Sequence, residues 1–331
     1  MRYTLPCIET TTCGEPTRFV TVFGLPGDTM VAKQAYVRQN LDYIRKALVR
    51  EPRGHRHMFG GIVTAPVTPG SAFGIIWFDN QDYLPGCGHA TLAAGIAMVE
   101  TGMVPNAGNQ AEFAVDVPSG QLKLRVKIEN GRATETSFVN VPAFAPITNA
   151  EIDVPGIGKL KADVAWGGNF FAIVSAEQVG IEIRPTKMSA LAAAAVKIRE
   201  AANQQLKVQH PTLKHLNSIP LISFQGKPTR KGARYINTHM FADGAIDRSP
   251  GGTGTSAALA ALYAKGEVKI GQEIIAEGIA GGQFRGRLVG ETTLGGVAAV
   301  VPEITGPAFI TGFHQFVLNP DDPSVFGFDM V

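Results

Sequence analysis

The chain has 331 residues, of which 45% are apolar, and its 30 basic and 28 acidic residues give a formal net charge of +2. This length suits two domains. The near-neutral charge and the lack of a basic stripe with interleaved aromatic residues argue against a nucleic-acid partner. No apolar run reaches the roughly 18 residues that a bilayer crossing needs. The N-terminus has no apolar signal segment, so we expect no membrane association.

The cysteines indicate the compartment. Cys7, Cys13 and Cys87 are odd in number, so they cannot all pair, and their spacing is not that of a metal site. We therefore expect thiols in a reducing cytoplasm. Cys7 and Cys13 lie in surroundings that suggest ordinary packing.

Several short segments rich in β-branched and aromatic residues predict strands. In chain order they are Arg18–Phe23, Gly74–Phe78, Leu122–Ile128, Phe170–Ser175, Arg234–Phe241 and Leu288–Glu291. Two longer segments have apolar residues at helical spacing and predict amphipathic surface helices, Ala32–Arg50 and Ser189–Val208. Each half of the chain therefore holds one such helix at a matching position, which favours an internal duplication.

Two other segments, Ala90–Val99 and Ser256–Tyr263, are almost entirely small and apolar. A helix that is apolar all round is buried, so each half is expected to hold a central buried helix wrapped by short strands. We place the N-terminal domain at residues 1–128, joined by a C-terminal segment of about 310–331. The second domain then spans residues 129–309.

Each predicted buried helix follows a proline and a glycine-rich turn. The first turn contains P-G-C-G-H-A-T and the second contains S-P-G-G-T-G-T. Aligned on these turns, Gly252 matches Gly88 and Thr253 matches His89, whereas Cys87 matches Gly251, which has no side chain. One turn therefore carries a reactive group and the other is bare.

A thiol at a helix start is chemically poised. The first N–H groups of a helix have no partner within it and together carry about half a positive charge, so they bind anions such as a carboxylate. That field stabilises a thiolate and lowers a thiol pKa from its usual value of about 8.5. Cys87, Gly88 and His89 are thus candidates for a carboxylate cradle with a base beside it. Packing alone also accounts for a buried cysteine or an ordinary histidine at a helix cap.

Other residues have two interpretations. Asp247 precedes the second turn, where it either holds a substrate ammonium or caps the turn. Phe59 and Phe241 lie at strand ends and are also typical of a core. The second turn is similar to a phosphate loop but lacks the lysine and spacing of one, which argues against nucleotide binding.

These motifs resemble the proline racemase family, which shares the diaminopimelate-epimerase-like fold. The resemblance rests on T-x-G-E-P-T-R at Thr12, M-F-G at Met58, C-G-H at Cys87, G-G-N-F at Gly167, D-R-S-P-x-G-T-G-T-S-A from Asp247, and a C-terminal F-V-L-N-P-D-D-P. It implies an α/β (α+β) chain of two pseudo-symmetric domains, each a mostly antiparallel sheet wrapped around a central helix. It also implies an active site in the interdomain cleft, no cofactor or metal, and a homodimer.

The resemblance implies roles for individual residues. The catalytic acid/base matches Cys87, and the second acid/base of racemases and 4-hydroxyproline epimerases falls at Gly251. In trans-3-hydroxy-L-proline dehydratases that second position is usually Thr. Ring contacts carry over to Phe59 and Phe241, and this pair argues against a hydroxyproline epimerase. A family histidine is Thr11 here, a departure without an assigned effect. Substrate carboxylate and amine binding carry over to Gly88, His89, Gly252, Thr253 and Asp247.

Inverting an α-carbon needs an acid/base group on each face, and Gly251 supplies none. We therefore predict a cofactor-independent trans-3-hydroxy-L-proline dehydratase that uses Cys87 alone. The alternatives are a 4-hydroxyproline 2-epimerase or proline racemase with water on the bare face, and a catalytically silent binder of proline-like amino acids.

Overall fold

The computed structural model describes residues 3–106, 108–241 and 244–329, and its chain divides into two compact units. Unit 1 comprises residues 1–138 and 306–331, and unit 2 comprises residues 139–305. The sequence predicts the boundary at residue 128, which lies inside a strand, whereas unit 1 continues to residue 138. The E-N-G-R segment that follows forms a turn within unit 1, where Asn130 and Gly131 have φ values of 51° and 75°. The next strand therefore stays in unit 1.

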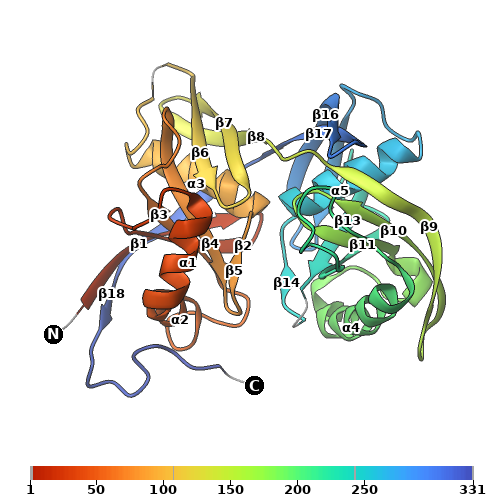
Figure 1. Ribbon diagram of the computed structural model, residues 1–331, viewed down its shortest axis with the longest axis horizontal. Helices are drawn as coiled ribbons and strands as arrows, with labels where there is room; N and C mark the ends of the chain where they lie inside the picture. Colours follow the sequence, from red (N-terminus) through yellow and green to blue (C-terminus); the bar gives the residue numbers. More distant parts are fainter. Residues whose placement is uncertain (1–2, 107, 242–243, 330–331) are drawn as a thin grey trace. The chain divides into compact units, whose positions relative to one another are not determined.

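Unit 1 is a twisted sheet with a central helix (Figure 1). Its elements are β1 (Tyr3–Thr12), β2 (Glu15–Thr21), α1 (Met30–Asn40), α2 (Asp42–Val49), β3 (Phe59–Thr64), β4 (Ser71–Asp79), β5 (Tyr83–Leu84), α3 (Gly88–Glu100), β6 (Gln110–Val117), β7 (Gly120–Glu129), β8 (Arg132–Val139) and β18 (Phe309–Leu318). Helix α3 contacts β1, β2, β3, β7 and β18, so the strands wrap around it.

Unit 2 repeats this plan. Its elements are β9 (Phe144–Val154), β10 (Gly158–Trp166), β11 (Phe170–Ser175), the 3-10 turns Ala176–Val179 and Pro185–Lys187, α4 (Met188–Gln205), β12 (Leu221–Gly226), β13 (Tyr235–Met240), β14 (Ile246–Asp247), α5 (Gly252–Ala264), β15 (Glu273–Gly278), β16 (Gln283–Leu294) and β17 (Val297–Gly306). Helix α5 contacts β9, β10, β11 and β16.

The strand pairing establishes the duplication. In unit 1 the sheet runs β18-β1-β2-β3-β4-β6-β7, in which β2–β3 and β4–β6 are parallel and the other neighbours are antiparallel. In unit 2 it runs β9-β10-β11-β12-β13-β15-β16, with the parallel pairs β11–β12 and β13–β15 at the same places. The short hairpins β4–β5 and β13–β14 also correspond. The prediction of two pseudo-symmetric, mostly antiparallel wrapped sheets is confirmed.

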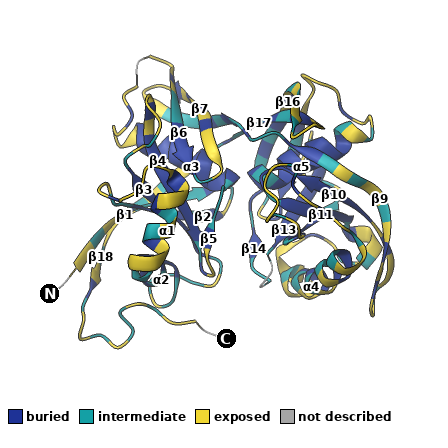
Figure 2. Ribbon diagram, in the orientation of Figure 1, coloured by how far each residue is buried: buried dark blue, intermediate teal, exposed yellow. Residues whose placement is uncertain are grey.

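Both predicted central helices are buried, as Figure 2 shows in dark blue. In α3 every residue from Gly88 to Val99 is buried, and α5 is buried over most of its length. Because successive residues of a strand point to opposite faces, each sheet packs a second layer on its other side. Ile62 of β3 joins α2 in one core, and Ile222 of β12 joins α4 in the other. Among the described residues, no helix has the length and apolar character to cross a membrane.

One predicted helix proved to be two. The segment Ala32–Arg50 breaks at Leu41, whose φ of −129° and ψ of 17° are not helical, and it forms α1 and α2. Asp42 favours a new start there, because a carboxylate is stabilised in the first turn of a helix and this one pairs with Arg45 at 2.7 Å. Nor is α2 a surface helix throughout: Arg45 is buried and donates to the carbonyl of Asn80 at 2.6 Å. The second predicted helix, Ser189–Val208, is confirmed as α4 but ends at Gln205.

We predict that Gly95→Ala destabilises unit 1. Alanine normally strengthens a helix by about 1 kcal/mol relative to glycine, but a Cβ on Gly95 would lie 2.3 Å from Oγ1 and 2.6 Å from Cγ2 of Thr136 on β8. We expect a net loss of about 1–3 kcal/mol in urea unfolding. Thr136→Ala removes both atoms and should restore most of that loss in the double variant. A Gly95→Ala protein as stable as the wild type would contradict this close packing.

Candidate active site

The N-terminus of α3 carries the predicted catalytic thiol. Cys87 is the N-cap, with φ −149° and ψ 118°, and it is only partly buried. Its carbonyl oxygen accepts from the backbone N–H of Thr91 at 3.0 Å and from the hydroxyl of Thr91 at 2.6 Å. The side chain therefore stands at the positive end of a buried helix dipole, which is the position that the sequence predicted.

The thiol has an imidazole beside it. Nδ1 of His89 lies 3.3 Å from Sγ of Cys87, and Nε2 lies 3.7 Å from it. The ring is 3% exposed and meets the ring of Phe59 edge-on at 4.9 Å, and the His89 carbonyl accepts from the hydroxyl of Thr12 at 3.1 Å. Three predicted residues, Cys87, His89 and Phe59, thus come together in unit 1. A thiol and an imidazole at this distance can exchange a proton, the arrangement that activates nucleophilic or basic cysteines.

The N-terminus of α5 shares the N-cap ψ and the first hydrogen bond of α3 but has no thiol. Gly251 is its N-cap, with ψ 117°, and its carbonyl accepts from the N–H of Thr255 at 2.8 Å, as Cys87 does from Thr91. Its φ is 70°, a conformation that favours glycine because a Cβ would clash with the backbone. Gly88 and His89 begin α3, and Gly252 and Thr253 begin α5. Each helix start therefore presents N–H groups that lack helical partners and that can bind an anion.

Sequence reasoning missed His239, which fills the place beside Gly251. A Cβ built on Gly251 would lie 2.3 Å from both Cδ2 and Nε2 of His239. The ring is 2% exposed, stacks edge-on with Phe171 at 5.2 Å, and donates from Nε2 to the carbonyl of Pro250 at 2.9 Å. Burial lowers the pKa of His239, which keeps it neutral at pH 7. Its only sequence signal was the unusual glycine at position 251.

Asp247 stands on the same turn. One carboxylate oxygen, Oδ1, accepts from the N–H of Ser249 at 2.9 Å and from its hydroxyl at 2.7 Å, and the Ser249 hydroxyl in turn accepts from the N–H of Gly251 at 3.0 Å. Oδ2 points to Gly251, 3.4 Å from an ideal Cβ there. Asp247 therefore caps the turn with one oxygen and directs the other toward the bare N-cap. Ser249, which links the two, was also missed.

The remaining predicted residues make fewer contacts with the residues described above. Phe241 is partly buried just after β13, and its backbone N–H donates to the carbonyl of Ala245 at 2.9 Å. Cys7 is buried in the core of unit 1, and burial raises its pKa to about 12. Cys13 lies in the turn between β1 and β2 with φ 53°. Cys7 is therefore a packed, unreactive thiol, as expected.

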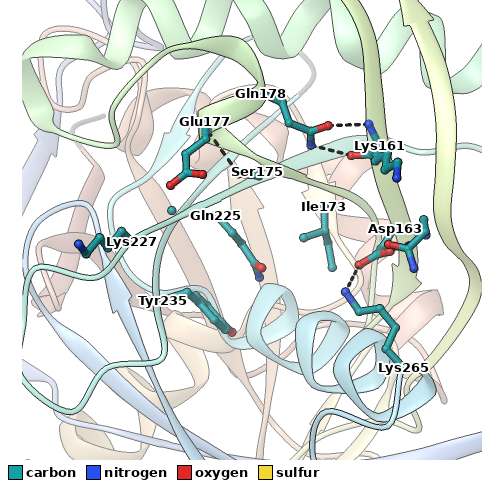
Figure 3. Close-up of a pocket in the computed structure, with 12 residues that line it drawn as sticks. Lys161, Asp163, Ile173, Ser175, Glu177, Gln178, Gln225, Lys227, Tyr235 and Lys265 are labelled. Carbon is teal, nitrogen blue, oxygen red and sulfur yellow. Dashed lines mark hydrogen bonds and ion pairs between the residues drawn. The ribbon is translucent and has the colours of Figure 1, made fainter.

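Unit 2 also has cavities that involve none of the predicted residues. One of about 460 Å³ is lined by side chains that include Lys161, Asp163 and Lys265, the last two forming an ion pair at 2.7 Å (Figure 3). Tyr235, also on its wall, precedes His239 by four residues on β13, about 13 Å along the strand. None of the residues that line this cavity belongs to the Gly251 turn.

Thiol labelling should distinguish these cysteines. We expect iodoacetamide at pH 7.5 to modify Cys87 and to leave Cys7 unmodified, because the Cys7 thiol is buried and its pKa is raised. Peptide mass spectrometry reads the sites directly, and Cys87→Ser should remove its label without changing Cys7. Fast modification of Cys7 in the folded protein would contradict the description of its surroundings.

His239 should make unit 2 less stable in acid. The unfolded imidazole takes up a proton near pH 6.5, whereas the buried ring resists it. The unfolded state then binds more protons below that pH, so stability falls as the pH drops through 6.5, by at most about 1.4 kcal/mol per pH unit for one group. His239→Asn should flatten the dependence of the urea midpoint on pH between 7 and 5.5. His210→Asn should flatten the slope in the same direction, because burial also lowers the pKa of His210. An unchanged slope in His239→Asn would contradict the prediction.

Comparison with known proteins agrees with this geometry. The model of the family described as proline racemase matches residues 7–329. A proline racemase of Clostridioides difficile is 44% identical over 98% of this chain and 97% of its own. A trans-3-hydroxy-L-proline dehydratase of Azospirillum brasilense is 36% identical over 98% and 97%. A hydroxyproline epimerase from Agrobacterium vitis, solved with bound trans-4-hydroxy-L-proline, superposes with a TM-score of 0.90 at 28% identity, covering 99% of this chain and 95% of that one. The chain therefore belongs to the proline racemase family.

Proposed function

We propose that this protein dehydrates trans-3-hydroxy-L-proline to Δ1-pyrroline-2-carboxylate with Cys87 as its single acid/base. The carrying observation is the asymmetry of the two helix starts. Cys87 stands at one with His89 at 3.3 Å, and the other presents Gly251 beside a buried imidazole whose N–H is already bound to Pro250. Chemistry that needs a proton carrier on only one face fits this arrangement best.

The stereochemistry of the substrate matches a single acid/base. In trans-3-hydroxy-L-proline the hydroxyl is trans to the carboxylate, so it lies on the same ring face as the α-hydrogen. The Cys87 thiolate removes that hydrogen, the C–H electrons form a C2–C3 double bond, and the C3–O bond breaks. The same thiol then gives its proton to the departing hydroxide, which leaves as water. The enamine product tautomerises to the pyrroline, so no redox partner is needed.

The other predicted residues stabilise the charge that develops. Removal of an α-hydrogen places negative charge on the carboxylate, and N–H groups aimed at that charge lower the barrier. The first-turn amides of Gly88, His89, Gly252 and Thr253 supply them. In this proposal Oδ2 of Asp247 takes the ring ammonium. Phe59 and Phe241 contact the apolar ring carbons.

Inversion at the α-carbon is the second candidate. It is favoured by the higher identity to the proline racemase, 44% against 36% for the dehydratase. In that case a water beside Gly251 replaces the second side chain. Water is a poor acid at neutral pH, so inversion by this route is slow.

We expect pyrroline from trans-3-hydroxy-L-proline only, when the protein is incubated in D₂O with that compound, L-proline and trans-4-hydroxy-L-proline. Pyrroline is assayed with o-aminobenzaldehyde, α-deuterium by mass spectrometry and inversion by chiral chromatography. Cys87→Ser should lower dehydration by at least about 100-fold, the usual contribution of a positioned acid/base.

Cys13→Ser is the matched control. Cys13 lies in the turn between β1 and β2 and has no role in the proposed mechanism, so this variant should dehydrate the substrate at the wild-type rate. Efficient inversion of either other substrate would replace the dehydratase by an isomerase. Saturable binding without deuterium exchange or product would leave a silent binder of proline-like amino acids.

A further inference from the structure

We propose that His239 determines which reaction this enzyme performs, because its imidazole occupies the space that an acid/base side chain at position 251 would need. The inference rests on the proposed function and deepens it. In this view His239 fills the space beside Gly251, so a thiol does not fit there. Proton transfer is then possible only from the face that Cys87 serves.

The two N-caps, Cys87 and Gly251, direct a Cβ atom in the same way relative to the helix that follows. The ψ angle fixes the direction of a Cβ relative to the residues that follow it. Since ψ is 118° at Cys87 and 117° at Gly251, a Cβ at Gly251 would stand over α5 as that of Cys87 stands over α3. That point lies 2.3 Å from two ring atoms of His239, far inside the contact distance of about 3.5 Å between nonbonded carbon atoms. A side chain at 251 and the imidazole therefore exclude each other.

A second glycine supports the same conclusion. Gly254 follows in the first turn of α5, at the position that Ala90 has in α3, and a Cβ there would lie 2.2 Å from Cε1 and 2.3 Å from Nε2 of His239. Glycine weakens a helix relative to alanine, so its presence in a buried helix needs a packing reason. The imidazole supplies one for both positions, because Gly251 and Gly254 together form the space that it fills.

The ring is also fixed in place and is not presented to a substrate. Its Nε2 donates to Pro250, whose carbonyl also accepts from Nδ2 of Asn237 at 2.9 Å. Nδ1 is buried and has no hydrogen-bond partner among the described residues, and it lies 2.9 Å from the ideal Cβ point of Gly254. A neutral ring with its donor engaged and its acceptor turned to α5 cannot deliver a proton from the bare turn. His239 is thus a specificity-determining residue and not a second acid/base.

The test is a double-variant cycle between positions 239 and 251 in the full chain. Gly251→Cys alone should lower the Tm by at least about 5 °C and give no racemisation of L-proline. His239→Val/Gly251→Cys should recover most of that Tm and racemise L-proline at least 10-fold faster than the wild type, measured as D-proline and α-deuterium in D₂O. His239→Val alone should gain no racemisation.

Matched variants separate the contributions. Gly251→Ala should lose stability like Gly251→Cys, and His239→Val/Gly251→Ala should recover it without racemisation, because alanine carries no proton. Gly266→Ala, at a residue of unit 2 with φ 73° and no atoms within 4 Å of an added Cβ, gives the cost of a positive φ without the clash.

Two outcomes would overturn the inference. One is a Gly251→Cys protein that keeps the wild-type Tm or racemises L-proline without a change at position 239. The other is a wild-type protein that exchanges the α-proton of L-proline rapidly and loses that exchange in a folded His239→Val protein, which would make His239 itself the second acid/base. The Tm and racemisation readouts do not use 3-hydroxyproline, so a failure of the dehydratase proposal remains distinguishable.

Discussion

The structure depends on the burial of two helix N-termini inside wrapped sheets. Helices α3 and α5 are apolar on every side, so each can only lie in a core, and each begins at a glycine-rich turn. The first N–H groups of each helix have no helical partners, and leaving them unpaired in a core is costly unless another acceptor, such as an anion, takes them. In the proposed function these helix starts bind the substrate carboxylate through backbone amides, which do not depend on the side chain at each position.

The duplicated units make the asymmetry interpretable. Corresponding strands pair in the same order and sense, and both N-caps have nearly the same ψ. Against this shared frame, three differences coincide at one point: glycine at 251, glycine at 254, and an imidazole that fills the space of both. A glycine at position 251 alone would leave empty space beside it, and here His239 of β13 fills that space. The two glycines and His239 therefore form one packing arrangement, in which the ring occupies the space that side chains at 251 and 254 would need.

Much of this was predictable from the sequence. The buried helices and most strands follow from composition and periodicity. Cys87 and His89 were recognised as candidate site residues because a reactive group stands at a helix start. The break at Leu41 was missed because the apolar spacing continues through it. The new helix begins at Asp42, whose carboxylate pairs with Arg45, and apolar spacing does not reveal such a local start. His239 was missed for a different reason. Its contact with Gly251 spans 12 residues and two elements, and every residue of β13 is buried, so no local pattern distinguishes His239 or shows what it contacts.

The Asp247–Ser249–Gly251 chain of hydrogen bonds has a consequence for how such a site changes over evolutionary time. It anchors the turn through backbone groups and a neighbouring serine, so these contacts use no side chain at position 251. Because the His239 ring fills the space beside Gly251, a side chain at position 251 also requires a smaller residue at position 239. A second acid/base at this turn therefore needs two substitutions at once.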